Sequence, residues 1–159
     1  MARTHTVLAS PIGPLTAVRD GGVLVGLTMG APPGAETLGQ RHDAGFADVR
    51  GQLAEYFAGT RTTFDLPLRA TGNPLQLAVW ELIAAIPYGI TRSYGELARD
   101  LGDGNLAQAV GTACGGNPLP VVVPCHRVVG ADGSLVGFGG GLNRKRFLLD
   151  LEHREERLF

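Results

Sequence analysis

Cysteine is scarce in this chain, and long apolar runs are absent from it. Among 159 residues there are only two cysteines, Cys114 and Cys125. A small secreted domain usually carries more cysteines, joined as disulfides. We therefore expect two free thiols in a cytoplasmic protein. The longest apolar runs, such as Val121–Val123, are too short to cross a membrane, and the first residues lack the apolar stretch of a signal peptide.

An excess of positive charge is also missing. The chain has 14 basic and 15 acidic residues and a formal net charge of −1. Proteins that bind nucleic acid are often basic, so this balance gives such a function no support, although it does not exclude one. Hydrophobic residues make up 44% of the chain, which predicts a packed globular protein. The length allows one compact domain or two small ones.

The first 70 residues have the pattern of a small α/β domain. Residues 3–29 form apolar and β-branched runs separated by turn signals, which predicts strands. Residues 30–45 are rich in glycine, alanine and proline and are predicted to form a loop. Apolar residues recur at helical spacing over 46–57, and residues 64–68 have the pattern of a short strand.

The pattern changes near residue 70, where we place a boundary between domains 1–70 and 71–159. Asn73 and Pro74 are typical of the cap and the first residue of a helix, which we expect to continue to Ile86. This boundary is a prediction from local pattern alone.

A pair of short helices is predicted next. Ser93 and Glu96 match a capping box that opens a helix to Leu101, and a second helix is expected over 105–115. Two short helices with a tight glycine-containing link favour a helix-turn-helix. After the apolar run 121–123, Asp132-Gly133 predicts a hairpin. The glycines of 137–141 predict a loop, and Asn143 is the expected cap of a last helix.

The stretch Pro124-Cys125-His126-Arg127-Val128-Val129 carries most of the chemical information. A cysteine is a good nucleophile only as a thiolate, and a histidine can take its proton while a carboxylate orients that histidine. Neighbours in sequence need not touch, however, and a cysteine after a valine-rich run can equally be a small buried apolar residue. The dipeptide alone does not decide between these interpretations.

The motif Pro-Cys-His-Arg-Val resembles the active-site signature of the methylated-DNA–protein-cysteine methyltransferases, also called 6-O-alkylguanine-DNA alkyltransferases. The resemblance covers essentially all of residues 72–152 in the family's order, and Ser10–Leu15 resembles the start of the family's N-terminal domain. The other matching segments are Ala78-Val79-Trp80, Ile86-Pro87-Tyr88-Gly89, Ser93-Tyr94-Gly95-Glu96-Leu97-Ala98, Ala109-Val110-Gly111, Asn117-Pro118, Gly140-Gly141-Leu142, Lys145, Leu148-Leu149 and Glu152.

The resemblance implies an α+β chain. Its small N-terminal α/β domain would be ribonuclease H-like, and its mostly helical C-terminal domain would be winged helix-turn-helix-like. It further implies a monomer that binds double-stranded DNA containing 6-O-alkylguanine and flips the damaged base into a pocket. The alkyl group would pass once and irreversibly to the protein. No metal or organic cofactor is implied, because the lesion supplies its own electrophilic carbon.

Individual roles follow from the same resemblance. Cys125 would accept the alkyl group, His126 would relay its proton through a water, and Glu152 would orient His126. We accordingly expect a lowered pKa for the Cys125 thiol. Tyr94 would donate a proton to the departing base, and Asn117 would tie the recognition helix to the active-site loop. The residues expected to line the base pocket are Val128, Phe138, Gly139 and Cys114, and those expected to contact DNA are Gln108, Ala107, Ser93 and Arg127.

The sequence departs from the family pattern at three places. Gln108 stands where the family has an arginine that fills the gap left by the flipped base, and glutamine lacks its charge and planar fork. Phe138 replaces a usual tyrosine, and Gly139 leaves room where Ser or Ala is common. Residues 72–159 also hold eight basic residues against nine acidic ones. DNA binding is therefore expected to be weak and sensitive to salt.

Other interpretations remain open for single residues and for the whole chain. Three of these residues also have an ordinary structural interpretation. Tyr94 could be a half-buried aromatic residue, Asn117 a turn residue before Pro118, and Glu152 part of a solvated helix end. A weakly active or non-catalytic sensor of alkylated bases is the main alternative, and Cys125 argues against it. A thiol redox enzyme is disfavoured because no Cys-x-x-Cys motif occurs, and a cysteine hydrolase because a domain with a helix-turn-helix is a poor scaffold for one. The spacing of histidines and cysteines fits no zinc motif.

Overall fold

The computed structural model describes residues 3–30, 38–134 and 141–153. The chain divides into two compact units, Met1–Thr71 and Gly72–Phe159, each with buried apolar side chains of its own. No helix in the described ranges is long and apolar enough to span a membrane.

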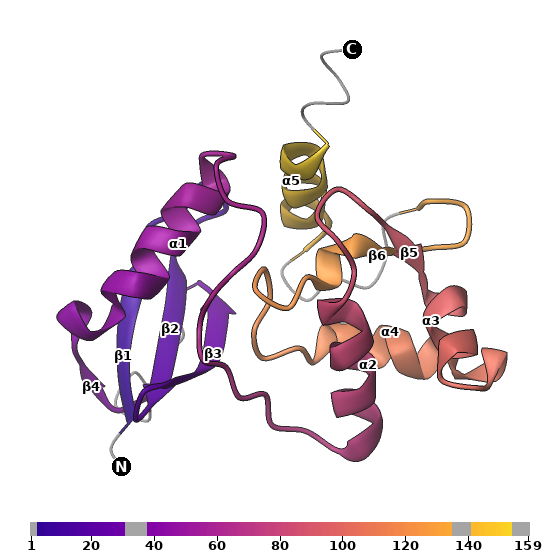
Figure 1. Cartoon of the computed structure of the whole chain (residues 1–159), viewed down its shortest axis with the longest axis horizontal. Helices are drawn as coiled ribbons and strands as arrows, with labels where there is room; N and C mark the ends of the chain where they lie inside the picture. The colour runs from indigo at the N-terminus through magenta and orange to yellow at the C-terminus, as the bar shows by residue number, and fades with distance from the viewer. Residues whose placement is uncertain (1–2, 31–37, 135–140, 154–159) are drawn as a thin grey trace. The chain divides into compact units, whose positions relative to one another are not determined.

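The first unit is built on a four-stranded sheet with the strand order β3-β2-β1-β4 (Figure 1). β1 (Arg3–Leu8), β2 (Leu15–Asp20) and β3 (Val23–Met29) are antiparallel neighbours, which confirms the strands predicted over 3–29. β4 (Gln40–Arg41) runs parallel to β1 within the segment predicted to be a loop. A strand of two exposed polar residues has no alternation of apolar and polar residues that a sequence could reveal.

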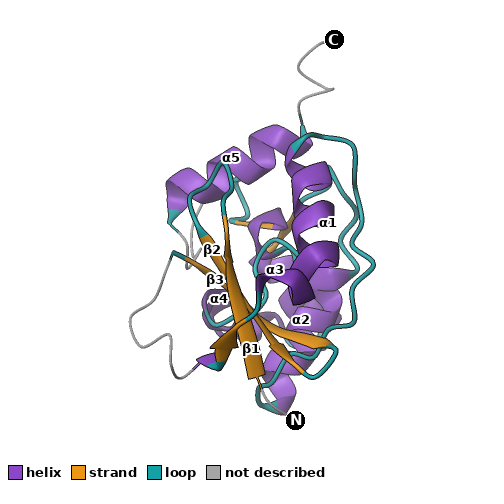
Figure 2. Ribbon diagram, turned by 90° about the vertical axis from the view of Figure 1, so that its left-hand side faces the viewer, coloured by secondary structure: helices purple, strands orange, loops and turns teal. Residues whose placement is uncertain are grey.

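Helix α1 (Ala47–Phe57) packs against this sheet after a turn of 3₁₀ helix, Asp43–Phe46 (Figure 2). The helix buries Val49, Leu53 and Tyr56, as its apolar spacing predicts. An ion pair between Arg19 on β2 and Asp48, 2.6 Å apart, fixes the start of the helix on the sheet. This unit therefore has the sheet-and-helix composition predicted for the first 70 residues.

The strand predicted over residues 64–68 is wrong. The segment makes only an isolated bridge, between Leu68 and Leu24 of β3. The Leu24 amide donates to the Pro67 carbonyl and the Arg69 amide donates to the Leu24 carbonyl. Pro67 has no N–H of its own, so the segment cannot extend a regular ladder along β3.

The second unit is mostly helical. It contains the helices α2 (Pro74–Ala84), α3 (Tyr94–Asp100), α4 (Ala107–Gly115) and α5 (Leu142–Glu152), with the 3₁₀ turns η3 (Gly104–Leu106) and η4 (Cys125–Arg127). Two short parallel strands, β5 (Arg92–Ser93) and β6 (Val128–Val129), join the entry of α3 to the exit of η4. Because α3 and α4 pack on each other across η3, the predicted helix pair is confirmed.

The predicted starts of α2 and α3 are confirmed in atomic detail. The Asn73 side chain accepts a hydrogen bond from the Gln76 backbone amide at 2.8 Å, and the Gln76 side-chain oxygen accepts one from the Asn73 backbone amide at 2.9 Å. Ser93 and Glu96 form the same reciprocal box at 3.1 Å in both directions. These boxes satisfy amide groups that have no partner inside the helix.

The predicted cap of the last helix is wrong. The helix α5 begins at Leu142, so Asn143 lies inside its first turn and Gly141 occupies the cap position. Gly141 has a φ of 95°, a conformation that glycine adopts without steric cost. The turn at Asp132-Gly133 is present, with the Gly130 amide bound to the Ser134 carbonyl at 2.8 Å. Residues 137–140 of the predicted glycine-rich loop lie outside the described residues.

Candidate active site

Cys125 begins the η4 turn, and the backbone before it is unusual. Val121 has a φ of 74° although it is β-branched, a conformation that persists only where surrounding packing fixes it. Val121 is 1% exposed and Cys125 is 2% exposed. The apolar run 121–123 is thus an irregular buried segment that delivers the Cys125 thiol to a fixed position among the helices.

Asn117 fixes the Cys125 sulfur. Its side-chain amide donates to the Cys125 Sγ at 2.9 Å and to the Val123 carbonyl at 2.8 Å. Its side-chain oxygen accepts the Leu119 amide at 2.9 Å, which sets the orientation of the amide group. Asn117 follows Gly116, the C-cap of α4, so it links this helix to the segment that carries the thiol.

A second thiol, Cys114, lies on the last turn of α4 and is 4% exposed. Interaction with the Cys125 thiol lowers the pKa of Cys114. Interaction with Cys114, together with burial, raises the pKa of Cys125. We expected His126 and Glu152 to lower the pKa of Cys125, and this expectation is wrong because the surroundings of the thiol raise its pKa. The groups that act on this sulfur are Cys114, Asn117 and Lys145.

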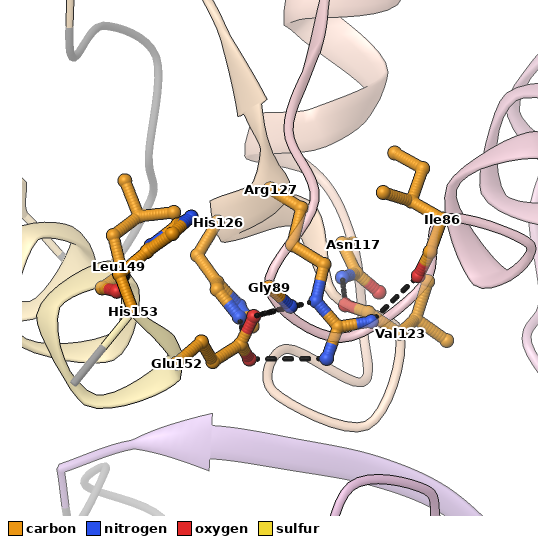
Figure 3. Close-up of polar contacts among 9 residues, drawn as sticks. All are labelled: Ile86, Gly89, Asn117, Val123, His126, Arg127, Leu149, Glu152 and His153. Carbon is orange, nitrogen blue, oxygen red and sulfur yellow. Dashed lines mark hydrogen bonds and ion pairs between the residues drawn. The ribbon is translucent and has the colours of Figure 1, made fainter. Parts of the chain in front are cut away.

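Glu152 contacts the side chains of the two residues that follow Cys125 in the sequence, His126 and Arg127 (Figure 3). The His126 Nε2 atom lies 2.6 Å from the Glu152 Oε2 atom. The Arg127 guanidinium donates to both Glu152 oxygens, at 2.8 and 3.0 Å, and to the Ile86 carbonyl at 2.6 Å. The side chains of His126 and Glu152 have no exposed surface. The last turn of α5 is thereby joined to η4 by a buried network.

The electrostatics of this network set the protonation of His126. Burial opposes a charge on Glu152, but the hydrogen bonds from His126 and Arg127 hold its pKa well below the usual value, so it is ionised. Burial lowers the pKa of His126, which leaves the ring neutral at pH 7. Because Nε2 faces an ionised carboxylate, it carries the ring proton and donates it. Nδ1 is then a free acceptor, and it is buried without a hydrogen-bond partner among the described residues.

Tyr94 on α3 and Lys145 on α5 form a second polar contact of this unit. The Lys145 ammonium donates to the Val128 carbonyl at 2.6 Å and lies 3.4 Å from the Tyr94 hydroxyl. Burial raises the pKa of Tyr94, with a further contribution from the two cysteines, so its hydroxyl keeps its proton. Burial also lowers the pKa of Lys145, while both cysteines oppose this. The cluster therefore offers one protonated hydroxyl and one cation beside the thiols.

The match to family models covers nearly the whole chain. Residues 74–154 match the DNA binding domain of 6-O-methylguanine DNA methyltransferase, and residues 4–70 match its ribonuclease-like domain. The chain belongs to this family. Its α+β class, with a ribonuclease-like first domain and a helical DNA-binding second domain, is confirmed with it.

Individual relatives match along almost their full length. A methylated-DNA–protein-cysteine methyltransferase of Mycobacterium bovis is 47% identical over 150 residues, which are 93% of this chain and 91% of the relative. A crystal structure of the Mycobacterium tuberculosis O6-methylguanine methyltransferase has a TM-score of 0.89 at 45% identity, covering 96% of this chain and 93% of that chain. A Mycobacterium tuberculosis structure named OGT in complex with DNA has a TM-score of 0.87 at 45% identity, covering 95% and 93% of the two chains.

For this member of the methyltransferase family, the structure joins Cys125 to Asn117 and His126 to Glu152 by hydrogen bonds, as the sequence led us to expect. Cys125, His126, Glu152, Cys114 and Val128 are buried, and Asn117 and Tyr94 are half-buried. Phe138 and Gly139, expected at the base pocket, lie outside the described residues. The described ranges hold no group of three or more histidine, cysteine or acidic side chains arranged to bind a metal ion.

The residues expected to contact DNA fall into two groups. Gln108 is exposed and Ala107 is half-buried in the first turn of α4, and Ser93 is half-buried at the cap of α3. Arg127 is different. It is 7% exposed, and its guanidinium donates three hydrogen bonds, two to Glu152 and one to the Ile86 carbonyl. The burial of this guanidinium argues against the expected contact of Arg127 with DNA.

Sequence reasoning did not assign a role to Lys145, although this residue is among the matches to the family. Lys145 and Leu148 have no exposed surface, Leu149 is also buried, and Glu152 follows one turn later on α5. Charged residues at both ends of an apolar helical stripe are seldom buried unless they are paired. The apolar stripe with a charged residue at each end was therefore the sequence feature that could have predicted buried, paired charges on α5.

Proposed function

We propose that Cys125 accepts the alkyl group of 6-O-alkylguanine in double-stranded DNA, once and irreversibly, and so repairs the base. The observation that carries this proposal is the side-chain amide of Asn117 held 2.9 Å from the buried Cys125 sulfur, in a turn whose next residue, His126, is neutral and has a buried Nδ1 free to take a proton. The family membership supplies the substrate class.

The proposed chemistry is a direct displacement at the alkyl carbon. The Cys125 proton passes through a water to Nδ1 of His126, and Glu152 stabilises the resulting imidazolium. The sulfur forms a bond to the alkyl carbon while the bond from that carbon to the guanine oxygen breaks. The product is a thioether, which has no proton or leaving group to restore the thiol, so each protein molecule reacts once.

We propose that the departing base lies beside Tyr94 and the Val128 carbonyl. The Tyr94 hydroxyl retains its proton and can donate it to the guanine ring as negative charge develops there. The Val128 carbonyl can read an amino group on the base edge, and Lys145 holds this carbonyl in place at 2.6 Å. Phe138 and Gly139 remain proposed pocket residues on the strength of the family resemblance.

The DNA partner is proposed from the family and from the relative crystallised in complex with DNA. We propose that residues 71–159 bind duplex DNA through α3 and α4, with Gln108, Ala107 and Ser93 at the contact, and that residues 1–70 form a separate domain. The damaged base must leave the stack to reach a buried thiol. We also propose a monomer without a cofactor. A cytoplasmic location is proposed because both thiols are unpaired.

Intact-mass analysis of the protein after reaction with a duplex containing 6-O-methylguanine tests the proposal. We expect one added methyl group per molecule, located by peptide mapping on the peptide that contains Cys125. The Cys125→Ser variant is the control and should remain unmodified. Several turnovers per molecule, or a methyl group on Cys114, would contradict the proposal. An unmodified natural protein would favour a sensor without chemistry.

A further inference from the structure

Arg127 is a buried cation to which the proposed reaction gives no role. It ends the η4 turn, and its Nε and Nη2 atoms donate to the two oxygens of Glu152, to Oε1 at 2.8 Å and to Oε2 at 3.0 Å (Figure 3). The Oε2 atom also lies 2.6 Å from His126 Nε2. One carboxylate oxygen is therefore shared between the relay histidine and the arginine.

The segment between α2 and β5 holds the guanidinium in this orientation. The remaining nitrogen, Nη1, donates to the Ile86 carbonyl at 2.6 Å, and the Tyr88 ring centroid lies 5.7 Å from the guanidinium carbon. Gly89, with a φ of 79°, brings its amide within 3.5 Å of Glu152 Oε1. A planar fork bonded through three nitrogens and set over an aromatic ring is fixed in direction. The fold thus fixes Arg127 on the carboxylate.

We propose that Arg127 is a positioning residue of alkyl transfer, which keeps His126 a neutral proton acceptor by compensating the charge of the Glu152 carboxylate. The inference rests on the proposed function of Cys125 as the alkyl acceptor. Arg127 exchanges no proton in the reaction. The Cys125 proton passes through a water to His126 Nδ1, the sulfur bonds to the alkyl carbon, and guanine departs with the electrons of the broken carbon–oxygen bond.

The formal charges of the buried network explain this role. With a neutral imidazole the charges of Arg127 and Glu152 cancel, whereas a proton on His126 leaves a net positive charge in a buried site, which is costly. Without Arg127 the order reverses, because a lone buried carboxylate favours an imidazolium that forms an ion pair with it. An imidazolium already carries a proton on Nδ1 and cannot accept the proton of Cys125.

The other influences on His126 come from its burial and from one further cation. Burial lowers the pKa of the ring, Glu152 at the end of α5 raises it, and Arg127 and Lys145 lower it again. Lys145, also on α5, donates to the Val128 carbonyl. Arg127 makes two hydrogen bonds to the carboxylate itself, so it is the cation that sets the charge facing His126.

The test is a titration of the His126 ring in the full chain, followed by nitrogen-15 NMR without DNA. The chain has four histidines, and the His126→Asn variant identifies the signal. In the natural protein we expect a midpoint below the ordinary value of about 6.5, with the ring proton on Nε2 at neutral pH. A midpoint above that value, or a neutral ring with its proton on Nδ1, would overturn the inference without any change to Arg127.

The charge of Arg127 is tested by a matched pair of variants. Arg127→Gln keeps a hydrogen-bond donor at the carboxylate and removes the charge, so the midpoint of His126 should rise by about one unit or more. Arg127→Lys keeps the charge and loses the planar fork, and its midpoint should stay within about half a unit of the natural value. An unchanged midpoint in the glutamine variant, or an equal rise in both variants, would contradict the proposed role of the charge.

Loss of stability by itself should not move the midpoint. The control is Trp80→Phe, which removes a 2.8 Å hydrogen bond from the indole to the Ala113 carbonyl and leaves the charges of the network in place. The protein should become less stable while the midpoint of His126 stays at its natural value. A rise as large as that in Arg127→Gln would show that the midpoint follows a general loosening of the fold, and the inference would fail.

Methyl transfer from a damaged duplex, measured against pH on the same proteins, separates this inference from the function on which it rests. In Arg127→Gln the rate below both midpoints should be roughly tenfold lower and should recover at higher pH, as the His126 midpoint predicts. If the midpoint shifts but the natural protein takes no methyl group, the proposed function fails and the effect of Arg127 on His126 stands. If methyl transfer occurs with the same pH dependence in both proteins, the proposed function stands and this inference fails.

Discussion

His126 and Glu152 are 26 residues apart in the chain, yet His126 Nε2 lies 2.6 Å from Glu152 Oε2 and neither side chain has any exposed surface. The contact fixes the tautomer of the histidine, because an ionised carboxylate accepts from Nε2 and leaves Nδ1 as the acceptor. Arg127 compensates the charge of the same carboxylate. The arrangement therefore couples protein stability to the protonation state that the proposed reaction needs.

Stability should fall as the pH drops below neutrality. The pKa of His126 is lowered in the folded state, so the unfolded chain binds a proton at this site from about pH 6.5 downward, and unfolding becomes easier. The pKa of Glu152 is also lowered, so its contribution is present above about pH 4.5 and is lost as the pH falls further. Urea unfolding between pH 8 and pH 5 checks this. The slope contributed by one proton is about 1.4 kcal/mol per pH unit at most, and His126→Asn should remove it.

Alkyl transfer should depend on His126 far more than lesion binding does. The substitution His126→Ala removes the proton acceptor Nδ1. We therefore expect the rate of alkyl transfer at saturating DNA to fall by about 100-fold or more. Affinity of the Cys125→Ser background for a 6-O-methylguanine duplex should change little. A parallel loss of both quantities would show that His126 serves the fold and not the proton transfer.

The Tyr94 hydroxyl should be needed for departure of the base. The variant Tyr94→Phe keeps the ring against α4 and removes one proton donor, so transfer should slow by about 100-fold. The thermal midpoint should change little, because Tyr94 is only half-buried. Rapid-quench measurements at saturating duplex check the rate, and an unaltered rate would exclude the hydroxyl from the reaction.

Arg127 should matter for stability and not for contact with phosphates. In Arg127→Met the buried carboxylate of Glu152 loses its partner, a change that costs about 3–5 kcal/mol when one member of a buried pair is removed. The dependence of DNA affinity on salt concentration should keep its slope, since each lost phosphate contact reduces that slope by about one. Arg99→Met, at an exposed site on α3, is the control for stability.

Gln108 should limit the repair of duplex DNA. It is exposed in the first turn of α4, and a neutral amide fills the gap left by a flipped base less well than a longer, planar and charged side chain. The substitution Gln108→Arg should raise the rate on duplex DNA and leave the rate with free 6-O-benzylguanine nearly unchanged, because a free base needs no extrusion. Equal acceleration of both substrates, or of neither, would show that Gln108 is not the residue that fills the gap.

Local pattern was sufficient for much of the fold. Asn73 with Pro74 and Ser93 with Glu96 are start signals whose effect lies within one helical turn, so the sequence alone predicts them correctly. The predictions of local structure failed at two places. Residues 64–68 look like a strand, but Pro67 allows only a bridge to Leu24, and Gly141, with its positive φ, displaced Asn143 as the cap of α5.

By itself, the sequence determined the order of the elements and, through the Cys125 motif and its spaced matches, the family and the residues that matter. Only the tertiary structure decided what those residues touch. Arg127 turns inward because Glu152 and the Ile86 carbonyl satisfy its guanidinium. Contacts between residues far apart in sequence depend on how the helices pack. The spacing of apolar residues along the chain does not show which two distant side chains will form a hydrogen bond.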